Sequence, residues 1–138
     1  MNPAQTGLKK WHKVMEGGNA PAALAAIIAE DAAFHSPVVH TPQQGRALVV
    51  AYLAAAGQVF ADSQFTYQRE IVDGNQAMLE FTAEIDGVHI NGVDIIQFDD
   101  GGMIKDFKVM VRPLKAVNKL WKMMAAQLQA AQAHPSKA

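Results

Sequence analysis

Apolar residues recur at helical spacing in four stretches of this chain. The spacing predicts helices over residues 8–16, 19–31, 46–60 and 114–128. Gly17-Gly18 closes the first helix, and the second begins at Asn19 as its N-cap, with Pro21 in its first turn. The helix at 46–60 is apolar around almost its whole circumference, so we expect it to pack on two sides.

Between residues 65 and 112 the period of the pattern changes to two, which is typical of strands. The first of these strands alternates polar residues with Phe65, Tyr67, Arg69 and Ile71. Further strands are predicted at 77–85, 88–98 and 103–112, and a brief extended piece at 33–36 precedes the irregular chain between Pro37 and Pro42. The links between the four long strands are too short for a crossover helix, so their sheet should be antiparallel.

Three helices followed by a run of long antiparallel strands form an α+β order. Such a sheet buries its apolar face only by bending over the helices, which makes a cone with an open mouth. Concave apolar sites of this kind are where small ligands bind. Because the 138 residues contain no linker or repeat, we expect a single domain over residues 1–132 and a flexible tail at 133–138.

Composition excludes several classes of function. Half of the residues are apolar, 18% are charged and the formal net charge is −1, which argues against disorder, and no apolar run is long enough for a membrane span. Lysine and arginine are scattered, so the basic surface that nucleic acids require is absent. Without cysteine, an export signal, metal-ligand spacing or a glycine-rich phosphate loop, we expect a soluble, cytoplasmic protein with no metal and no cofactor.

Three segments carry a family resemblance. Residues 11–19, residues 28–37 with Gly45-Arg46, and residues 92–99 with 102–104 resemble the landmarks of the ketosteroid isomerase-like and SnoaL-like group of the nuclear transport factor 2-like superfamily. The resemblance implies a strongly bent antiparallel sheet wrapped around three helices, plus a C-terminal helix, with one apolar pocket. It does not fix the chemistry, because this scaffold hosts isomerases, polyketide cyclases, dehydratases, epoxide hydrolases and proteins without activity.

Position by position, the resemblance implies an altered isomerase site. The carboxylate base of the isomerases falls on Ser36, and their oxyanion tyrosine in the first helix falls on Trp11, whose indole donates one hydrogen bond but cannot relay a proton. Two supporting tyrosines fall on Ile28 and Leu53. The oxyanion-hole aspartic acid alone is matched, by Asp94, so the chain is not a conventional ketosteroid isomerase and delta-5 ketosteroid isomerisation should be near background.

Even when the family resemblance is set aside, Asp94 is the most informative residue of the chain. It is in phase with Ile90, Ile96 and Phe98 on a predicted strand. Desolvation would favour its protonated form, which can donate a hydrogen bond to a ligand carbonyl as a catalytic acid. The alternatives are a carboxylate paired with an arginine (Arg69 or Arg112) or one hydrogen-bonded at a dimer-facing surface.

Three histidines are candidates for the missing base. His35 stands beside Ser36, but adjacent residues of a strand point to opposite faces, which favours a packing role for His35. His40 lies in the loop that either hangs at the mouth of the cavity or is simply solvated. His12 shares the helical face of Trp11 and is expected to look inward. We expect a ligand-binding cavity lined by Trp11, His12, Ser36, Tyr52, Leu53, Asp94 and Phe107.

Three functions follow from the sequence. The first is a cofactor-free isomerase, cyclase or hydrolase acting on a small apolar carbonyl or polyketide-like compound, with Asp94 as acid or oxyanion donor. The second is a protein that binds such a ligand without turnover, and the third is a dimerisation module with an incidental cavity. A homodimer is expected in any case, because Val93, Ile95 and Met110 would form an outward apolar patch on the sheet.

Overall fold

A computed structural model describes residues 1–133 of the chain. Its helices are α1 (Pro3–Glu16), α2 (Pro21–Ala25), α3 (Arg46–Val59) and α4 (Leu114–Ala133). Helix α1 begins earlier than the apolar spacing indicates, because the side chains of Asn2 and Gln5 form a capping box with each other's backbone. The predicted C-terminal tail lies, from residue 134 on, outside the described residues.

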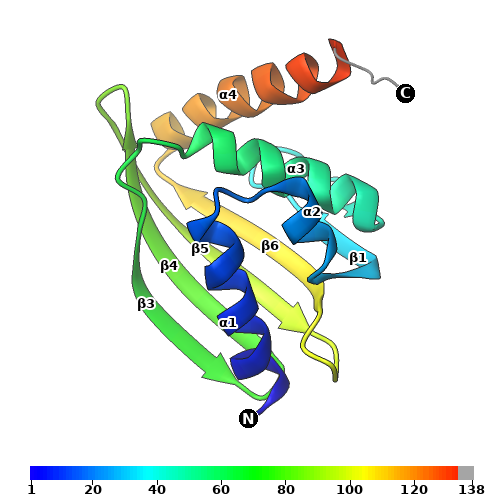
Figure 1. Cartoon of the computed structure of the whole chain (residues 1–138). Coiled ribbons are helices and arrows are strands. Elements are labelled where there is room, and N and C mark those ends of the chain that lie inside the picture. Colours follow the sequence, from blue (N-terminus) through cyan, green and yellow to red (C-terminus); the bar gives the residue numbers. More distant parts are fainter. Residues whose placement is uncertain (134–138) are drawn as a thin grey trace.

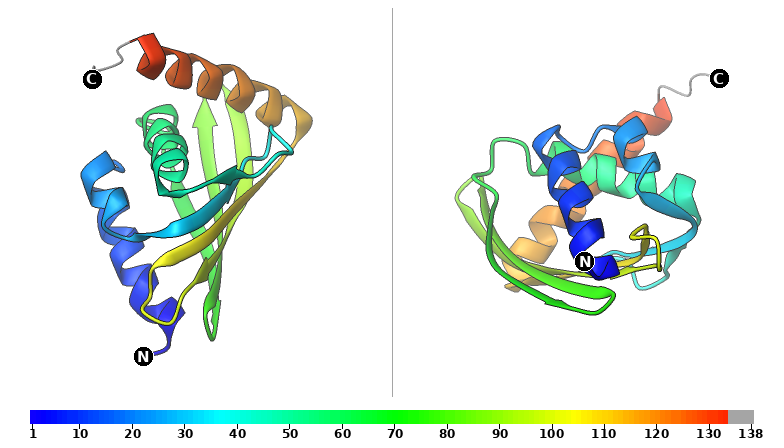
Figure 2. Two further views of the ribbon diagram at one scale, coloured as in Figure 1. Left: turned by 90° about the vertical axis from the view of Figure 1, so that its right-hand side faces the viewer. Right: turned by 60° about the horizontal axis from the view of Figure 1, so that its bottom comes forward.

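A six-stranded sheet forms the body of the fold (Figure 1). Its strands are β1 (Ile28–His35), β2 (Gln43–Gln44), β3 (Thr66–Asp73), β4 (Gln76–Ile85), β5 (Val88–Phe98) and β6 (Ile104–Arg112), in the spatial order β2-β1-β6-β5-β4-β3. The four long strands pair antiparallel, as predicted, whereas β1 joins β6 in parallel. The sheet bends around α1 and α3, and α4 closes the wide end (Figure 2). The predicted α+β cone is therefore confirmed.

The second predicted helix is wrong over most of its length. Helix α2 ends at Ala25, and the chain turns into β1 at Ile28. The reason is tertiary: the backbone N–H of Ile104 donates to the carbonyl of Ile27, and Ile28 pairs with Ile104, so pairing with β6 overrides a weak helical preference. Asn19 is not the N-cap either; it has a φ of 59°, and its side-chain amide donates to the carbonyl of Leu53.

Strand β3 contains an irregularity that changes which residues face the helices. The register with β4 shifts between Tyr67 and Arg69, so Tyr67 pairs with the inward-facing Phe81 and Glu70 pairs with the inward-facing Leu79. A bulge of this kind inserts one residue and moves the following side chains to the opposite face. The uninterrupted alternation predicted for Tyr67, Arg69 and Ile71 is therefore wrong, and Glu70 takes the inner face instead.

The apolar interior fills the space between the bent sheet and the helices. One cluster joins α1, β1, the start of α3 and the middle of the sheet, and a second joins the end of α3, the β4–β5 hairpin and α4. Between the two clusters lies the cavity described below. No helix within residues 1–133 is long and apolar enough to cross a membrane.

Candidate functional site

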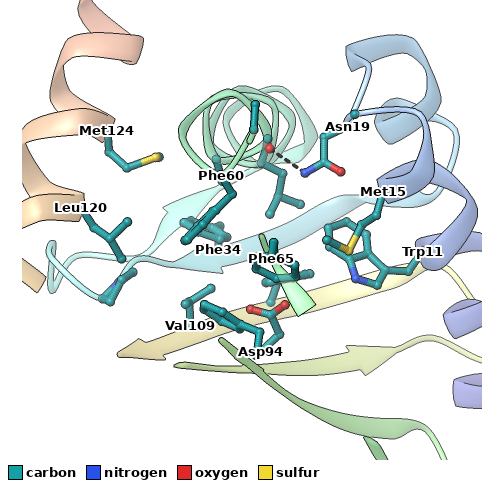
Figure 3. A pocket seen from close by; sticks show the side chains of 18 of the residues that line it. Trp11, Met15, Asn19, Phe34, Phe60, Phe65, Asp94, Val109, Leu120 and Met124 are labelled. Carbon is teal, nitrogen blue, oxygen red and sulfur yellow. Dashed lines mark hydrogen bonds between the residues drawn. The ribbon is translucent and has the colours of Figure 1, made fainter. Parts of the chain in front are cut away.

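A cavity of about 650 Å³ lies between the inner face of the sheet and helices α1, α3 and α4 (Figure 3). This volume is within the range of small-molecule sites. Seven aromatic side chains contribute to its wall: Trp11, Phe34, Phe60, Phe65, Tyr67, Phe81 and Phe107. Gly92 on β5 makes room for one of them, because a Cβ at that position would lie 2.4 Å from the ring of Phe81. The wall of the cavity is therefore largely apolar and rich in aromatic side chains.

Asp94 projects from β5 into this apolar space and is 6% exposed (Figure 3). Its Oδ2 accepts a hydrogen bond of 2.6 Å from the hydroxyl of Tyr67, and the Tyr67 oxygen accepts one of 3.1 Å from the indole N–H of Trp11. A hydrogen-bond chain thus runs from α1 through β3 to β5. The indole of Trp11 can only donate, so Tyr67 accepts this bond at its oxygen and keeps its own proton for Asp94.

The arginine-paired alternative for Asp94 is wrong. Arg69 lies on the outer face with its Nε 2.8 Å from Glu80, and Arg112 donates to the side chain of Asn91 at 2.9 Å. Asp94 therefore has a neutral hydroxyl as its partner instead of a cation. This leaves the cost of burying its charge largely uncompensated.

Burial raises the pKa of Asp94 to about 7, because desolvation disfavours the charged carboxylate, and the hydrogen bond from Tyr67 opposes the shift. Burial also raises the pKa of the Tyr67 hydroxyl, and the nearby charge of Asp94 adds to this effect. Tyr67 therefore stays protonated and serves as a fixed donor. Asp94 exists in both forms near neutral pH, and its protonated form can donate from Oδ1 to a ligand oxygen.

Sequence reasoning missed Tyr67 as a site residue. The only signal was its place beside Phe65 in an alternating strand, which indicates burial and gives no hint of a polar contact. Tyr67 lies 56 residues from Trp11 and 27 from Asp94, so the link exists only through the bend of the sheet. The hydroxyl that the resemblance implies for the first helix comes instead from β3.

The structure brings most of the predicted site residues together. Side chains that line the cavity are those of Trp11, His12, Ser36, Leu53, Asp94 and Phe107. Ser36 follows β1, and its hydroxyl accepts the backbone N–H of Val38 at 3.1 Å. His12 lies on α1 with its Nε2 2.9 Å from Oε2 of Glu70, and its ring meets Tyr67 edge to face at 5.7 Å.

Three predicted residues lie elsewhere. His35 points away from the cavity, and its Nε2 is 2.8 Å from Oδ1 of Asp106, because β1 turns Phe34 inward and therefore His35 outward. His40 is exposed in the loop before β2 and does not line the cavity. Tyr52 packs behind the wall, with its ring 5.4 Å from that of Phe34.

Among residues 1–133 no group of histidine, aspartate and glutamate side chains could hold a metal ion. The polar groups that line the cavity are carboxyl groups, an amide, hydroxyls, an indole N–H and one imidazole. Together they can donate hydrogen bonds, accept them and transfer protons.

A strongly bent sheet wrapped around helices, with a cavity between them, is the fold of the nuclear transport factor 2-like superfamily. Residues 8–107 match the family model of the SnoaL-like domain, and the chain belongs to this family. No curated protein sequence matches the chain.

Solved structures agree with this assignment. A steroid delta-isomerase from Pseudomonas aeruginosa is 33% identical, with a TM-score of 0.89 over 96% of each chain. A protein with a cystatin-like fold from Silicibacter pomeroyi is 32% identical, with a TM-score of 0.81 over 91% of this chain and 89% of that one. An NTF2-like protein from Mesorhizobium loti is 20% identical and shares the fold, with a TM-score of 0.69 over 82% of this chain and 96% of that one.

Proposed function

We propose that this protein binds a flat, largely apolar compound with a carbonyl or hydroxyl oxygen at one end, and that Asp94 polarises this oxygen in a cofactor-free, isomerase- or cyclase-type reaction. The observation that carries the proposal is the buried Asp94–Tyr67 pair in a largely apolar cavity of about 650 Å³ whose wall is rich in aromatic side chains. A polyketide-like or other polycyclic carbonyl compound has this shape and polarity.

The catalytic contribution of the pair is electrostatic. When a carbonyl gains negative charge, a donor already in place stabilises that charge without reorganising solvent, and one such donor contributes roughly 10²–10³ in rate. Protonated Asp94 supplies the donor at Oδ1, while Tyr67 holds Oδ2 in position. Burial of Asp94 among apolar and aromatic side chains lowers the local dielectric constant and strengthens the interaction.

The similarity to the Pseudomonas aeruginosa steroid delta-isomerase supports a ligand of this class. Ser36 argues against the same reaction, because a serine hydroxyl is a very weak proton acceptor and here it already accepts the N–H of Val38. Ser36 also favours the alternative function, in which the cavity holds its ligand without turnover.

Binding of 2-naphthol, monitored by its fluorescence, tests the proposal. This probe is flat and carries one hydroxyl, like the enol of a bicyclic ketone. We expect saturable binding that is weakened about tenfold or more in Asp94→Asn and in Trp11→Ala, because the first loses the carboxyl group and the second loses the wall and the chain's first donor.

His89→Ala is the matched control, since His89 is exposed on β5 and pairs with Glu84 at 3.3 Å, outside the cavity. It should bind 2-naphthol like the wild type. Equal binding by wild type and Asp94→Asn would contradict the role of Asp94, and absence of binding by the wild type would contradict the proposal as a whole.

We also propose that two copies of the chain associate through the outer face of the sheet. Ile71, Met78 and Met110 are 62%, 43% and 54% exposed there, and the half-buried Val93 and Ile95 lie between them on β5. A contiguous apolar patch of this kind is typical of a self-association surface.

A further inference from the structure

The His12–Glu70 pair lies at the cavity wall on α1 and β3. This is a different part of the fold from Ser36, where the resemblance puts a base. His12 lines the cavity from α1, and Glu70 reaches it from β3 at 2.9 Å. Ser36, in contrast, follows β1. The cavity therefore contains one imidazole held by a carboxylate, in addition to the buried Asp94.

The β3 bulge brings this pair together. In a regular strand Tyr67 and Glu70 would lie on opposite faces, because they are an odd number of residues apart. The register shift after Tyr67 places both on the inner face, where Glu70 contacts His12 and Tyr67 contacts Asp94. Bulges occur often next to active sites, where they redirect a side chain.

The contact with Glu70 determines which nitrogen of His12 is free. Nε2 of His12 lies 2.9 Å from Oε2 of Glu70. Because a carboxylate only accepts hydrogen bonds, this contact favours the form of His12 that carries its hydrogen on Nε2. In the neutral imidazole the lone pair is then on Nδ1, which can accept a proton. The orientation of a base by a carboxylate on its other nitrogen is the arrangement found in catalytic triads.

Stability does not account for the pair. The side chains of His12 and Glu70 are 35% and 40% exposed, and ion pairs with this much solvent contact contribute little to folding. Other groups near His12 are the ring of Tyr67, which it meets edge to face, and Glu16 on the same helix, which also lines the cavity. Neither of these replaces Glu70 as the partner of Nε2.

We propose that His12 is the proton acceptor of this site and that Glu70 is its positioning residue, an assignment that rests on the proposed function. Nδ1 of His12 takes a proton from the carbon next to the ligand carbonyl. The electrons of that C–H bond form the C=C bond of an enol, and the carbonyl oxygen accepts the proton of Asp94. Return of the two protons, to carbon and to Asp94, regenerates the ketone or its double-bond isomer.

Exchange of the α-protons of 2-tetralone in D₂O, followed by NMR, measures this step directly. It needs only a base and an oxygen donor, and each event replaces one C–H bond with a C–D bond, the deuteron coming from solvent through His12. We expect wild-type protein to catalyse exchange above the buffer background and His12→Ala to lower the rate at saturation about a hundredfold. Added imidazole should restore part of this loss, which a purely structural defect would not allow.

Glu70→Gln should lower the exchange rate at saturation several-fold while the half-saturating concentration of 2-tetralone stays unchanged, because the variant retains the side-chain size but not the charge. His89→Ala, which removes an equivalent histidine from an outer His–Glu pair, should exchange like the wild type.

Binding of 2-naphthol shows whether a negative result contradicts only the assignment of His12 or the proposed function as well. If the wild type binds 2-naphthol but exchanges 2-tetralone no faster than buffer, or if His12→Ala exchanges like the wild type, the assignment of His12 is overturned and the binding site stands. If the wild type does not bind 2-naphthol, the proposed function fails and the assignment of His12 fails with it.

Discussion

Replacing Asp94 by asparagine should make the protein more stable at alkaline pH, although the substitution removes the most conspicuous polar group of the cavity. Asparagine has the same shape and can still accept the hydroxyl of Tyr67, so the contact at 2.6 Å is preserved. What disappears is the cost of holding a negative charge in an apolar cavity. This cost is present only when the pH is high enough to ionise the carboxyl group.

The magnitude follows from the two pKa values of the carboxyl group. In the unfolded chain Asp94 titrates near its ordinary value of 3.8, and in the folded protein burial raises the pKa to about 7. Because the folded state holds the proton more tightly, the wild type loses stability as the pH rises from the first value to the second. At ~1.4 kcal/mol per unit, the loss approaches about 4 kcal/mol above pH 8 and is about 2 kcal/mol at pH 5.

Urea unfolding of both proteins at a series of pH values, at one fixed protein concentration, measures this loss as a difference. The free energy of unfolding of Asp94→Asn minus that of the wild type should increase by about 2–3 kcal/mol between pH 5 and pH 8.5. Asp31→Asn, which alters a carboxylate that is 75% exposed, should change stability by no more than about 0.5 kcal/mol. A difference for Asp94→Asn that does not vary with pH would refute the argument, because it would mean that Asp94 is not desolvated.

Three further outcomes are expected. Tyr67→Phe should cost about 1–3 kcal/mol in urea unfolding, because the buried indole N–H of Trp11 loses its acceptor; retained stability would contradict this hydrogen-bond chain. A direct assay of delta-5 ketosteroid isomerisation should give a rate near background for the wild type and a higher rate for Ser36→Asp; a robust wild-type rate would overturn the interpretation of Ser36. Light scattering across a dilution series should show a dimer that Ile95→Lys dissociates while 2-naphthol binding persists; a wild-type protein that stays monomeric at high concentration would exclude the outer sheet face as an interface.

The sequence predicts those parts of the fold whose signals are local. Helices α1, α3 and α4 and the four long strands each extend over eight or more residues, and the apolar pattern predicts all of them, although α1 begins five residues earlier and α4 ends five residues later than predicted. The failure at β1 has a physical cause. Residues 28–35 mix alanine with isolated large apolar residues, and only their parallel pairing with β6, far along the chain, selects a strand over a helix.

The residues of the candidate site also differ in whether a local sequence signal reveals them. Asp94 could be found from sequence because an acid in phase with three large apolar residues of one strand signals burial by itself. Tyr67 and Glu70 could not, because their roles depend on a bulge whose local trace is weak: the alternation from Phe65 to Ile71 is interrupted only at Arg69, and a single charged residue does not by itself indicate an inserted residue. The inserted residue turns Glu70 toward His12 on the first helix and turns Arg69 to the outer face, where it pairs with Glu80 and leaves Asp94 without a cation. One irregularity in β3 thus both places a carboxylate beside the imidazole and leaves the buried acid without a cation, so the two groups that we propose to move protons depend on the same backbone feature.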